Sequence, residues 1–220
     1  MNRKNLNMFT LEDVSTLERI IKNRRDVRGS RFTSQEIEPE KLERILHAGI
    51  NAPSVGFSQP WEFVLIKNQK IKEQVKACFN VENKKGGAQF SGAKQDLYSK
   101  LKLEGITEAP LNIAVFYKPS PHPVLGQTTM KDAGPFSVVC AIQNMWLMAR
   151  ALDLGLGWIS IIDPEQVKSI LNAPEDHQLI GYFALGYVDQ FYAIPELETI
   201  GWDQRKSLAD VVVYEQYPTP

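Results

Sequence analysis

The sequence predicts an α+β fold organised as one domain. Segments in which apolar residues recur every three or four positions, as in amphipathic helices, alternate with short runs of aromatic and β-branched residues, which favour strands. The 220 residues correspond to about one and a half average domains, which favours one large domain over two complete ones. No internal repeat and no change of composition typical of a linker divides the chain. We therefore expect residues 1–220 to form a single domain.

The expected helices share an apolar face at helical spacing, and most are bounded by a capping residue or by proline. The first begins at Thr10, where Asp13 is placed to complete a cap, and ends near Asn23. Asp163 and Pro164 form the cap and first position of the last one. In chain order, the expected helices cover residues 10–23, 39–52, 71–79, 97–109, 133–149 and 164–171.

The expected strands are short runs of apolar, β-branched and aromatic residues. In chain order they are WEFVLIK (61–67), LNIAVFY (111–117), GWISII (157–162) and HQLIGYFALGYVD (177–189). Ser160 falls inside the third run, where we expect a hydroxyl that is hydrogen-bonded within the core.

Three segments lack a sustained hydrophobic period and are expected to be irregular. Residues 81–92 contain a Lys-Lys-Gly-Gly run, which predicts a mobile loop of the kind that often acts as a lid. Residues 118–130 are rich in proline and predict a second loop. The last thirty or so residues are interrupted by proline and glycine, which predicts an extended arm.

Charge and hydropathy exclude several classes of partner. The formal net charge is −1 and the pI is about 6.3, so the chain has no overall attraction for nucleic acid or for anionic lipid. The longest uncharged stretch, residues 133–149, is shorter than the roughly 20 apolar residues that a membrane-spanning helix needs. The N-terminal segment MNRKNLNMFTLEDV lacks the apolar region of a secretion signal. We expect a cytoplasmic protein with no nucleic-acid or membrane partner.

Several common kinds of site are not indicated by the sequence. The two cysteines show no Cys-x-x-Cys spacing and the three histidines are far apart, so we expect no metal. No phosphate-binding glycine pattern follows a strand, which disfavours a Rossmann or P-loop nucleotide site. Neither Ser137 nor Ser160 stands in a Gly-x-Ser-x-Gly sequence, so a hydrolase nucleophile has little support.

The densest candidate site directly follows the first helix and consists of Arg24, Arg25, Asp26, Val27 and Arg28. Three guanidinium groups within five residues match the geometry of a phosphate, and the carboxylate can accept hydrogen bonds from a ring N–H or a hydroxyl. This composition suits a phosphorylated small molecule. The alternative is a solvated run of charges that pair with one another, and composition alone favours it.

A second candidate is the loop APSVGFSQPW, residues 52–61, between the second helix and the first strand. Its small residues allow a close approach of the backbone to a ligand. Ser54 and Ser58 can donate hydrogen bonds to a carbonyl or a phosphate, although serine and proline in loops are more often turn formers.

The order RRDVR followed by APSVGFSQPW resembles the nitroreductase-like flavoprotein superfamily, in which an Arg-Arg-Ser/Asp-x-Arg segment and a Pro-Ser-x-x-Asn/Ser-x-Gln-Pro-Trp loop hold FMN. Four further segments are similar to its flavin-cleaving branch, the 5,6-dimethylbenzimidazole synthases: LKLEGITEAPLNIAVF, GLGWISIIDP, ALGY and PELETIGWDQR. The resemblance covers most of residues 23–208. Its most specific element is Asp26, where typical nitroreductases have serine, combined with Ser160 after Gly-Leu-Gly-Trp-Ile.

This resemblance implies a central, mostly antiparallel sheet flanked by helices. It also implies a homodimer that exchanges a lid, at about residues 81–108, and a C-terminal arm, at about residues 190–220. Two FMN sites would lie at the subunit interface, each drawing on both chains.

The resemblance also implies roles for individual residues. Asp26 and Ser160 would be catalytic: the carboxylate would relay protons and be kept ionised by its flanking arginines, and the serine would orient the flavin. The residues implied to bind FMN are Arg24, Arg25, Asp26, Val27, Arg28, Ser54, Ser58, Leu101, Ser160 and Arg205. Among them, Leu101 belongs to the lid and Arg205 would contact the phosphate.

In the flavin-cleaving branch, reduced FMN is itself the substrate. With O2 as co-substrate it is fragmented to 5,6-dimethylbenzimidazole, the lower ligand of vitamin B12, and D-erythrose 4-phosphate. The resemblance implies that a separate NAD(P)H-dependent flavin reductase supplies the reduced FMN. Two alternatives stay open: an NAD(P)H-dependent nitroreductase or dehalogenase-like oxidoreductase on the same scaffold, and a flavin-binding or storage protein. Asp26 and Ser160 favour the first function.

Overall fold

The protein has the α+β fold that the sequence predicts. The computed structural model describes residues 8–217. Residues 1–7, which belong to the N-terminal segment, and residues 218–220, which belong to the expected arm, lie outside the described residues of the expected domain. In the described part of the chain, four strands form one antiparallel sheet in the order β1-β2-β4-β3. Their bounds are Trp61–Ile66 (β1), Leu111–Tyr117 (β2), Leu154–Ile159 (β3) and Gln178–Tyr187 (β4).

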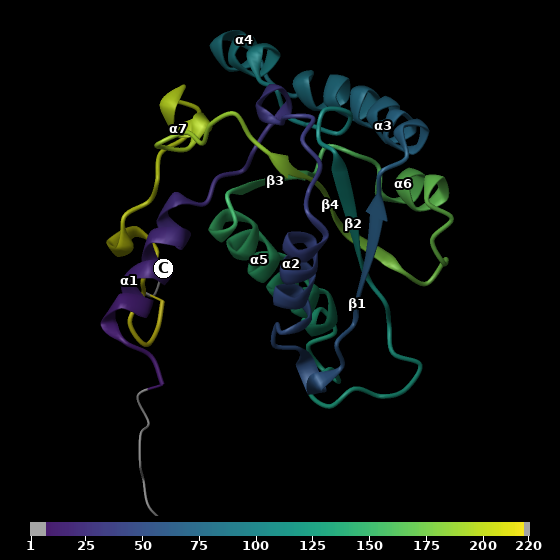
Figure 1. The fold of residues 1–220 in the computed structure, drawn as a ribbon, viewed down its shortest axis with the longest axis vertical. Coiled ribbons are helices and arrows are strands. Elements are labelled where there is room, and N and C mark those ends of the chain that lie inside the picture. The colour runs from purple at the N-terminus through teal and green to yellow at the C-terminus, as the bar shows by residue number, and fades with distance from the viewer. Residues whose placement is uncertain (1–7, 218–220) are drawn as a thin grey trace, which may run out of the picture.

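Helices cover both faces of this sheet (Figure 1). On one face, α2 (Pro39–Ile50) and α5 (Ala133–Ala151) pack on side chains such as Ile113 and Val115 of β2. On the other face, α3 (Gln69–Gly87) and α6 (Pro164–Ile170) pack on Ala114 and Phe116. Successive residues of a strand point to opposite faces, so the uncharged run of β2 is buried on both sides.

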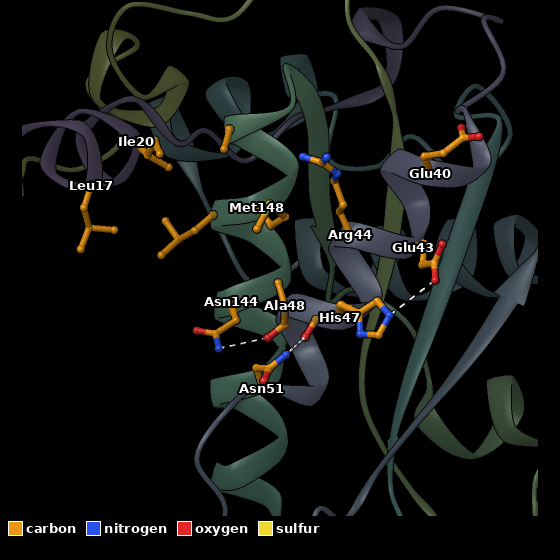
Figure 2. Close-up of a pocket in the computed structure, with 12 residues that line it drawn as sticks. Leu17, Ile20, Glu40, Glu43, Arg44, His47, Ala48, Asn51, Asn144 and Met148 are labelled. Atoms are coloured by element: carbon orange, nitrogen blue, oxygen red, sulfur yellow. Dashed lines mark hydrogen bonds and ion pairs between the residues drawn. The ribbon is translucent and has the colours of Figure 1, made fainter. Parts of the chain in front are cut away.

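Helix α1 (Leu11–Asn23) begins at Thr10, whose side chain accepts a hydrogen bond from the backbone N–H of Asp13 in a reciprocal cap. The expected bounds of this helix are confirmed. Its apolar face, however, is not buried: Leu11 is 86% exposed and Leu17 is 52% exposed. A cavity of about 680 Å³ separates α1 from α2 and α5, with Leu17 and Ile20 on its α1 side (Figure 2).

The prediction of a mobile loop at residues 81–92 is wrong. Helix α3 continues through the Lys-Lys-Gly-Gly run to Gly87, and α4 (Gly92–Lys100) begins five residues later. Lys85 pairs with Glu82 one turn earlier, and the ring of Tyr98 lies against the Gly86–Gly87 backbone, where side chains would interfere. The expected helix 97–109 is also wrong, because α4 ends at Lys100 and residues 101–105 are irregular.

The third strand begins and ends three residues earlier than expected, at Leu154–Ile159. Its two glycines, Gly155 and Gly157, obscure it in the sequence because glycine is usually unfavourable in strands. Here they allow residues 26–27 to lie directly against the strand, with the backbone N–H of Val27 donating to the carbonyl of Leu156 at 3.2 Å.

The remaining elements of the C-terminal region lie where the sequence predicts them. Asp163 caps α6 by accepting from the backbone N–H groups of Glu165 and Gln166. The segment after β4 is mostly irregular and contains α7 (Glu196–Thr199). Among the helices of residues 8–217, none has both the length and the apolar character required to cross a bilayer.

Substitution of Gly157 by alanine tests the contact between the segment 24–28 and β3. A Cβ atom at this position would collide with the backbone carbonyl oxygen of Val27, which cannot move away as a flexible side chain could. We expect a loss of about 1–3 kcal/mol of stability or more, measurable as a drop in Tm of at least about 2 °C. An unchanged Tm would contradict this close approach.

Candidate functional site

A pocket forms where the arginine-rich segment, the start of the irregular stretch after α4 and the C-terminal arm meet. The enclosed cavity has a volume of about 140 Å³. It brings together predicted site residues that are up to 181 positions apart in the sequence: Arg24, Arg25, Asp26, Arg28, Leu101 and Arg205. The rest of the wall is formed by residues that the sequence did not single out: Leu103, Tyr192, Pro195, Glu196 and Leu197.

Asp26 is held by two contacts at the edge of β3. One carboxylate oxygen accepts a hydrogen bond from the backbone N–H of Trp158 at 2.9 Å, and the other pairs with the guanidinium of Arg28. Burial raises the pKa of Asp26 above its ordinary value, and it outweighs the opposing effects of Arg28, the Trp158 N–H and Arg24. The arginines favour the ionised carboxyl, as expected, but they do not cancel the effect of burial on its pKa. A carboxyl with a raised pKa is better suited to accept and release a proton near neutral pH.

Arg25 and Arg28 use most of their donors on the protein itself. Arg25 is buried and donates to the carbonyls of Lys22 and Arg24 at the end of α1 and of Tyr192 and Ala193 in the arm. These contacts fix the arm to the first helix.

Arg28 connects the strand with the segment that follows α4. It donates to the carbonyl of Trp158 at 2.6 Å and to that of Leu103 at 3.2 Å, besides pairing with Asp26. Arg28 therefore positions the wall that contains Leu101 and Leu103.

Arg24 and Arg205 are the guanidinium groups left available to a ligand. Among residues 8–217, neither side chain has a hydrogen-bond or ion-pair partner, and Arg24 lies 4.8 Å from the centre of the Trp146 ring. The pKa of Arg25 is lowered by burial and then by the positive charges of Arg24, Arg205 and Arg150. The pocket therefore concentrates positive charge, which favours an anionic ligand.

Four predicted residues lie outside this pocket. Val27 is buried beneath it, against Gly155 and Gly157. Ser160 directly follows β3 and is exposed, so the expectation of a buried hydroxyl within a strand is wrong. Ser54 and Ser58 belong to the loop around the short helix η2 (Val55–Phe57).

The η2 loop contacts the far end of α5. The backbone N–H of Val55 donates to the hydroxyl of Ser137 at 3.0 Å, whereas the pocket is next to Trp146. Nine helical residues separate these two contacts, or about 14 Å along the helix. Ser54 accepts from the backbone N–H of Gln59, and the hydroxyl oxygen of Ser58 is buried without a partner among the described residues. One chain therefore does not bring both motifs to a common site.

The sequence gives only a weak signal for the wall residues that it does not single out. Pro195, Glu196 and Leu197 belong to the PELETIGWDQR segment, in which the resemblance implies a role only for Arg205. Leu103 belongs to the LKLEGITEAPLNIAVF segment, in which the resemblance implies a role only for Leu101, and Tyr192 stands in no recognisable pattern. In the described residues no group of three or more His, Cys, Asp or Glu side chains is arranged to hold a metal ion.

Comparisons with known proteins agree with this architecture. Residues 21–187 match the model of the nitroreductase family. The 5,6-dimethylbenzimidazole synthase of Rhodospirillum rubrum is 39% identical over 192 residues, covering 86% of this chain and 90% of the relative. The enzyme of the same name from Rhodobacter capsulatus is 34% identical over 190 residues, covering 86% and 91%. The iodotyrosine deiodinase of Daphnia pulex is 26% identical over 206 residues, covering 90% of this chain and 65% of that protein.

Solved structures share the fold. Oxidised iodotyrosine deiodinase bound to FMN and 3-iodo-L-tyrosine has a TM-score of 0.71 and 21% identity, covering 91% of this chain and 100% of that structure. A BluB-like flavoprotein from Clostridium difficile 630 has a TM-score of 0.67 and 20% identity, covering 91% and 99%.

The chain therefore belongs to the nitroreductase family. Within that family it belongs with the 5,6-dimethylbenzimidazole synthases, to which it is more similar in sequence than to the deiodinase.

The raised pKa of Asp26 predicts how the stability of the protein depends on pH. The folded protein binds a proton at this carboxyl more tightly than the unfolded chain does, so the contribution of Asp26 to stability falls as the pH rises above the unfolded pKa of about 3.9. Asp26→Asn removes this dependence. We expect the difference in Tm, variant minus wild type, to rise as the pH is raised from about 4 to about 8. Asp96→Asn, at an exposed position of α4, is the control. A difference in Tm that declines with rising pH would contradict the direction of the shift.

Proposed function

We propose that this protein uses O2 to fragment reduced FMN to 5,6-dimethylbenzimidazole and D-erythrose 4-phosphate. The observation that carries the proposal is the position of Asp26, a carboxyl with a raised pKa in the same pocket as two guanidinium groups that have no partner within residues 8–217. The names of the two relatives that are 39% and 34% identical to this chain support it, and they favour this activity over that of a nitroreductase or a deiodinase.

The residues of the pocket fit FMN. Arg24 and Arg205 offer their guanidinium groups to the phosphate, and charge-assisted contacts of this kind are strong and directional. Arg25 and Arg28 hold the arm and the segment 101–103 in place through carbonyl contacts. When bound, reduced FMN supplies the electrons for O2 and the carbon atoms of both products.

Asp26 acts as the proton carrier of the site. The backbone N–H of Trp158 fixes one carboxylate oxygen, and Arg28 fixes the other, so the group has a defined orientation toward the pocket. Leu101 and Leu103 exclude water from the same space, which protects chemistry that free water and protons would divert. Ser160, at the exposed end of β3, is the second proposed catalytic residue and orients the flavin.

A second copy of the chain completes each site. Ser54 and Ser58 are distant from the pocket within one chain, and the buried, unpartnered hydroxyl of Ser58 is suited to a ligand delivered from outside. The exposed apolar face of α1 offers a surface for the partner. The lid, at about residues 81–108, and the arm, at about residues 190–220, line the pocket of their own chain, so the exchange in the proposed dimer consists of contacts that these two segments also make with the partner.

A separate NAD(P)H-dependent flavin reductase supplies reduced FMN in this proposal. The nitroreductase alternative requires an open flavin face for both nicotinamide and the electron acceptor, whereas leucine side chains and the arm enclose this pocket. The cytoplasmic location and the organisation of residues 1–220 as one domain stay predictions.

Asp26→Asn tests the proposed activity. Loss of a positioned general acid or base lowers rates by about 10²–10⁴-fold, so we expect at least about a hundredfold slower formation of 5,6-dimethylbenzimidazole from reduced FMN in air. Product is measured by chromatography, and Asp96→Asn serves as the control. Benzimidazole formation at the wild-type rate in Asp26→Asn would refute the catalytic role. Oxidation of NAD(P)H with a nitroaromatic acceptor, without loss of flavin, would support the alternative instead.

Arg24→Gln and Arg205→Gln test the phosphate site. A hydrogen bond to a charged group contributes about 1.5–3 kcal/mol, so each substitution should weaken FMN binding by at least about tenfold. Riboflavin lacks the phosphate, and its affinity should change little. Titration of both flavins against both variants gives the comparison. Equal weakening of FMN and riboflavin would show that the arginines do not recognise the phosphate.

A further inference from the structure

Three aromatic rings join the region of α4 to the C-terminal arm. Phe90 lies in the turn between α3 and α4, Tyr98 lies on α4, and Trp202 follows α7. The ring centres of Phe90 and Tyr98 are 5.3 Å apart, and those of Phe90 and Trp202 are 5.1 Å apart in an edge-to-face arrangement. Lys94 of α4 adds a contact to the Trp202 ring at 5.1 Å. We call Phe90, Tyr98 and Trp202 the aromatic clasp.

The clasp connects two elements, α4 and α7, that have little hydrophobic anchoring of their own. No residue of α4 and no residue of α7 is buried, so neither helix is anchored by a hydrophobic core of its own. Figure 1 shows both at the edge of the molecule, away from the sheet. Tyr98 also donates to the side-chain oxygen of Asn83 at 2.8 Å, and its ring rests on the backbone at Gly86 and Gly87. The tyrosine therefore fixes α4 to the end of α3.

Two members of the clasp, Tyr98 and Trp202, are linked directly to the walls of the pocket. The backbone N–H of Leu101 donates to the carbonyl of Tyr98 at 3.1 Å, and the backbone N–H of Trp202 donates to the carbonyl of Leu197 at 2.9 Å. Leu101 and Leu197 both line the cavity, and Arg205 follows Trp202 by three residues. Separation of the aromatic rings would therefore move the two walls apart.

We infer that the aromatic clasp holds the lid and the arm together as one closing unit over the pocket. This inference rests on the proposed function for the identity of the ligand. The cavity of about 140 Å³ in one chain is smaller than the roughly 300–1,000 Å³ of ordinary ligand pockets, so the partner subunit covers part of the flavin and, with the clasp formed, the rest lies between these walls. Release of the clasp opens them, and its formation places Leu101 and Arg205 for catalysis. Phe90, Tyr98 and Trp202 are positioning residues of the site.

Amide hydrogen exchange on the full-length protein without flavin tests the clasp. Trp202→Ala removes the edge-to-face contact and should raise exchange of the amides in residues 93–101 about tenfold, while β2 stays protected. Trp202→Phe keeps an aromatic ring and should restore most of the protection. Tyr214→Ala, at an exposed position farther along the arm, is the matched control. Unchanged exchange of residues 93–101 in Trp202→Ala would overturn the inference.

The rate of FMN dissociation tests the closing role. We expect Trp202→Ala to release FMN about tenfold faster than the wild type at an unchanged global Tm, with Trp202→Phe close to wild type. Faster exchange without faster release would show that the clasp does not close the pocket. If the wild type binds flavin but does not fragment it, the proposed function fails, whereas the exchange and release measurements still decide the inference.

Discussion

The structure depends on the contact between residues 24–28 and the edge of β3. Gly157 allows the backbone of Val27 to reach the strand, which places the Asp26 carboxylate on the N–H of Trp158. From this anchored segment, Arg28 extends to the stretch after α4 and Arg25 extends to the arm. Five consecutive residues therefore assemble a pocket from three distant parts of the chain. The half-buried carboxylate is unfavourable by itself, and its guanidinium partner and backbone donor offset only part of the desolvation.

This arrangement explains how a nearly neutral protein can bind a phosphorylated ligand. The net charge of −1 excludes attraction to a long polyanion, but it says nothing about the local field. The arginines of the pocket are divided by function. Arg25 and Arg28 are used on carbonyl groups, and this fixed framework leaves Arg24 and Arg205 as the groups available for a phosphate. The proposed aromatic clasp adds a way to open and close the same space.

The sequence was sufficient for the elements whose signals are local. The capped helix at residues 11–23 and the uncharged strand at 111–117 follow from periodicity and capping alone. The end of α3 and the bounds of β3 were predicted wrongly because tertiary contacts decide them: Tyr98 packs on the glycines of α3, and Val27 packs on those of β3. Asp26 and the arginines of the pocket were found from their pattern or from the resemblance, whereas Tyr192 has no pattern and contributes only through the fold. The direction of the Asp26 pKa also depends on burial, which no sequence pattern reports.

A crystal structure of the dimer with FMN would test the central claim most directly. We expect the phosphate to lie within hydrogen-bond distance of Arg24 and Arg205 and the Asp26 carboxyl to face the flavin. Ser54 and Ser58 should be supplied by the partner subunit. Flavin bound instead in the cavity between α1, α2 and α5, or a phosphate held by neither arginine, would contradict it.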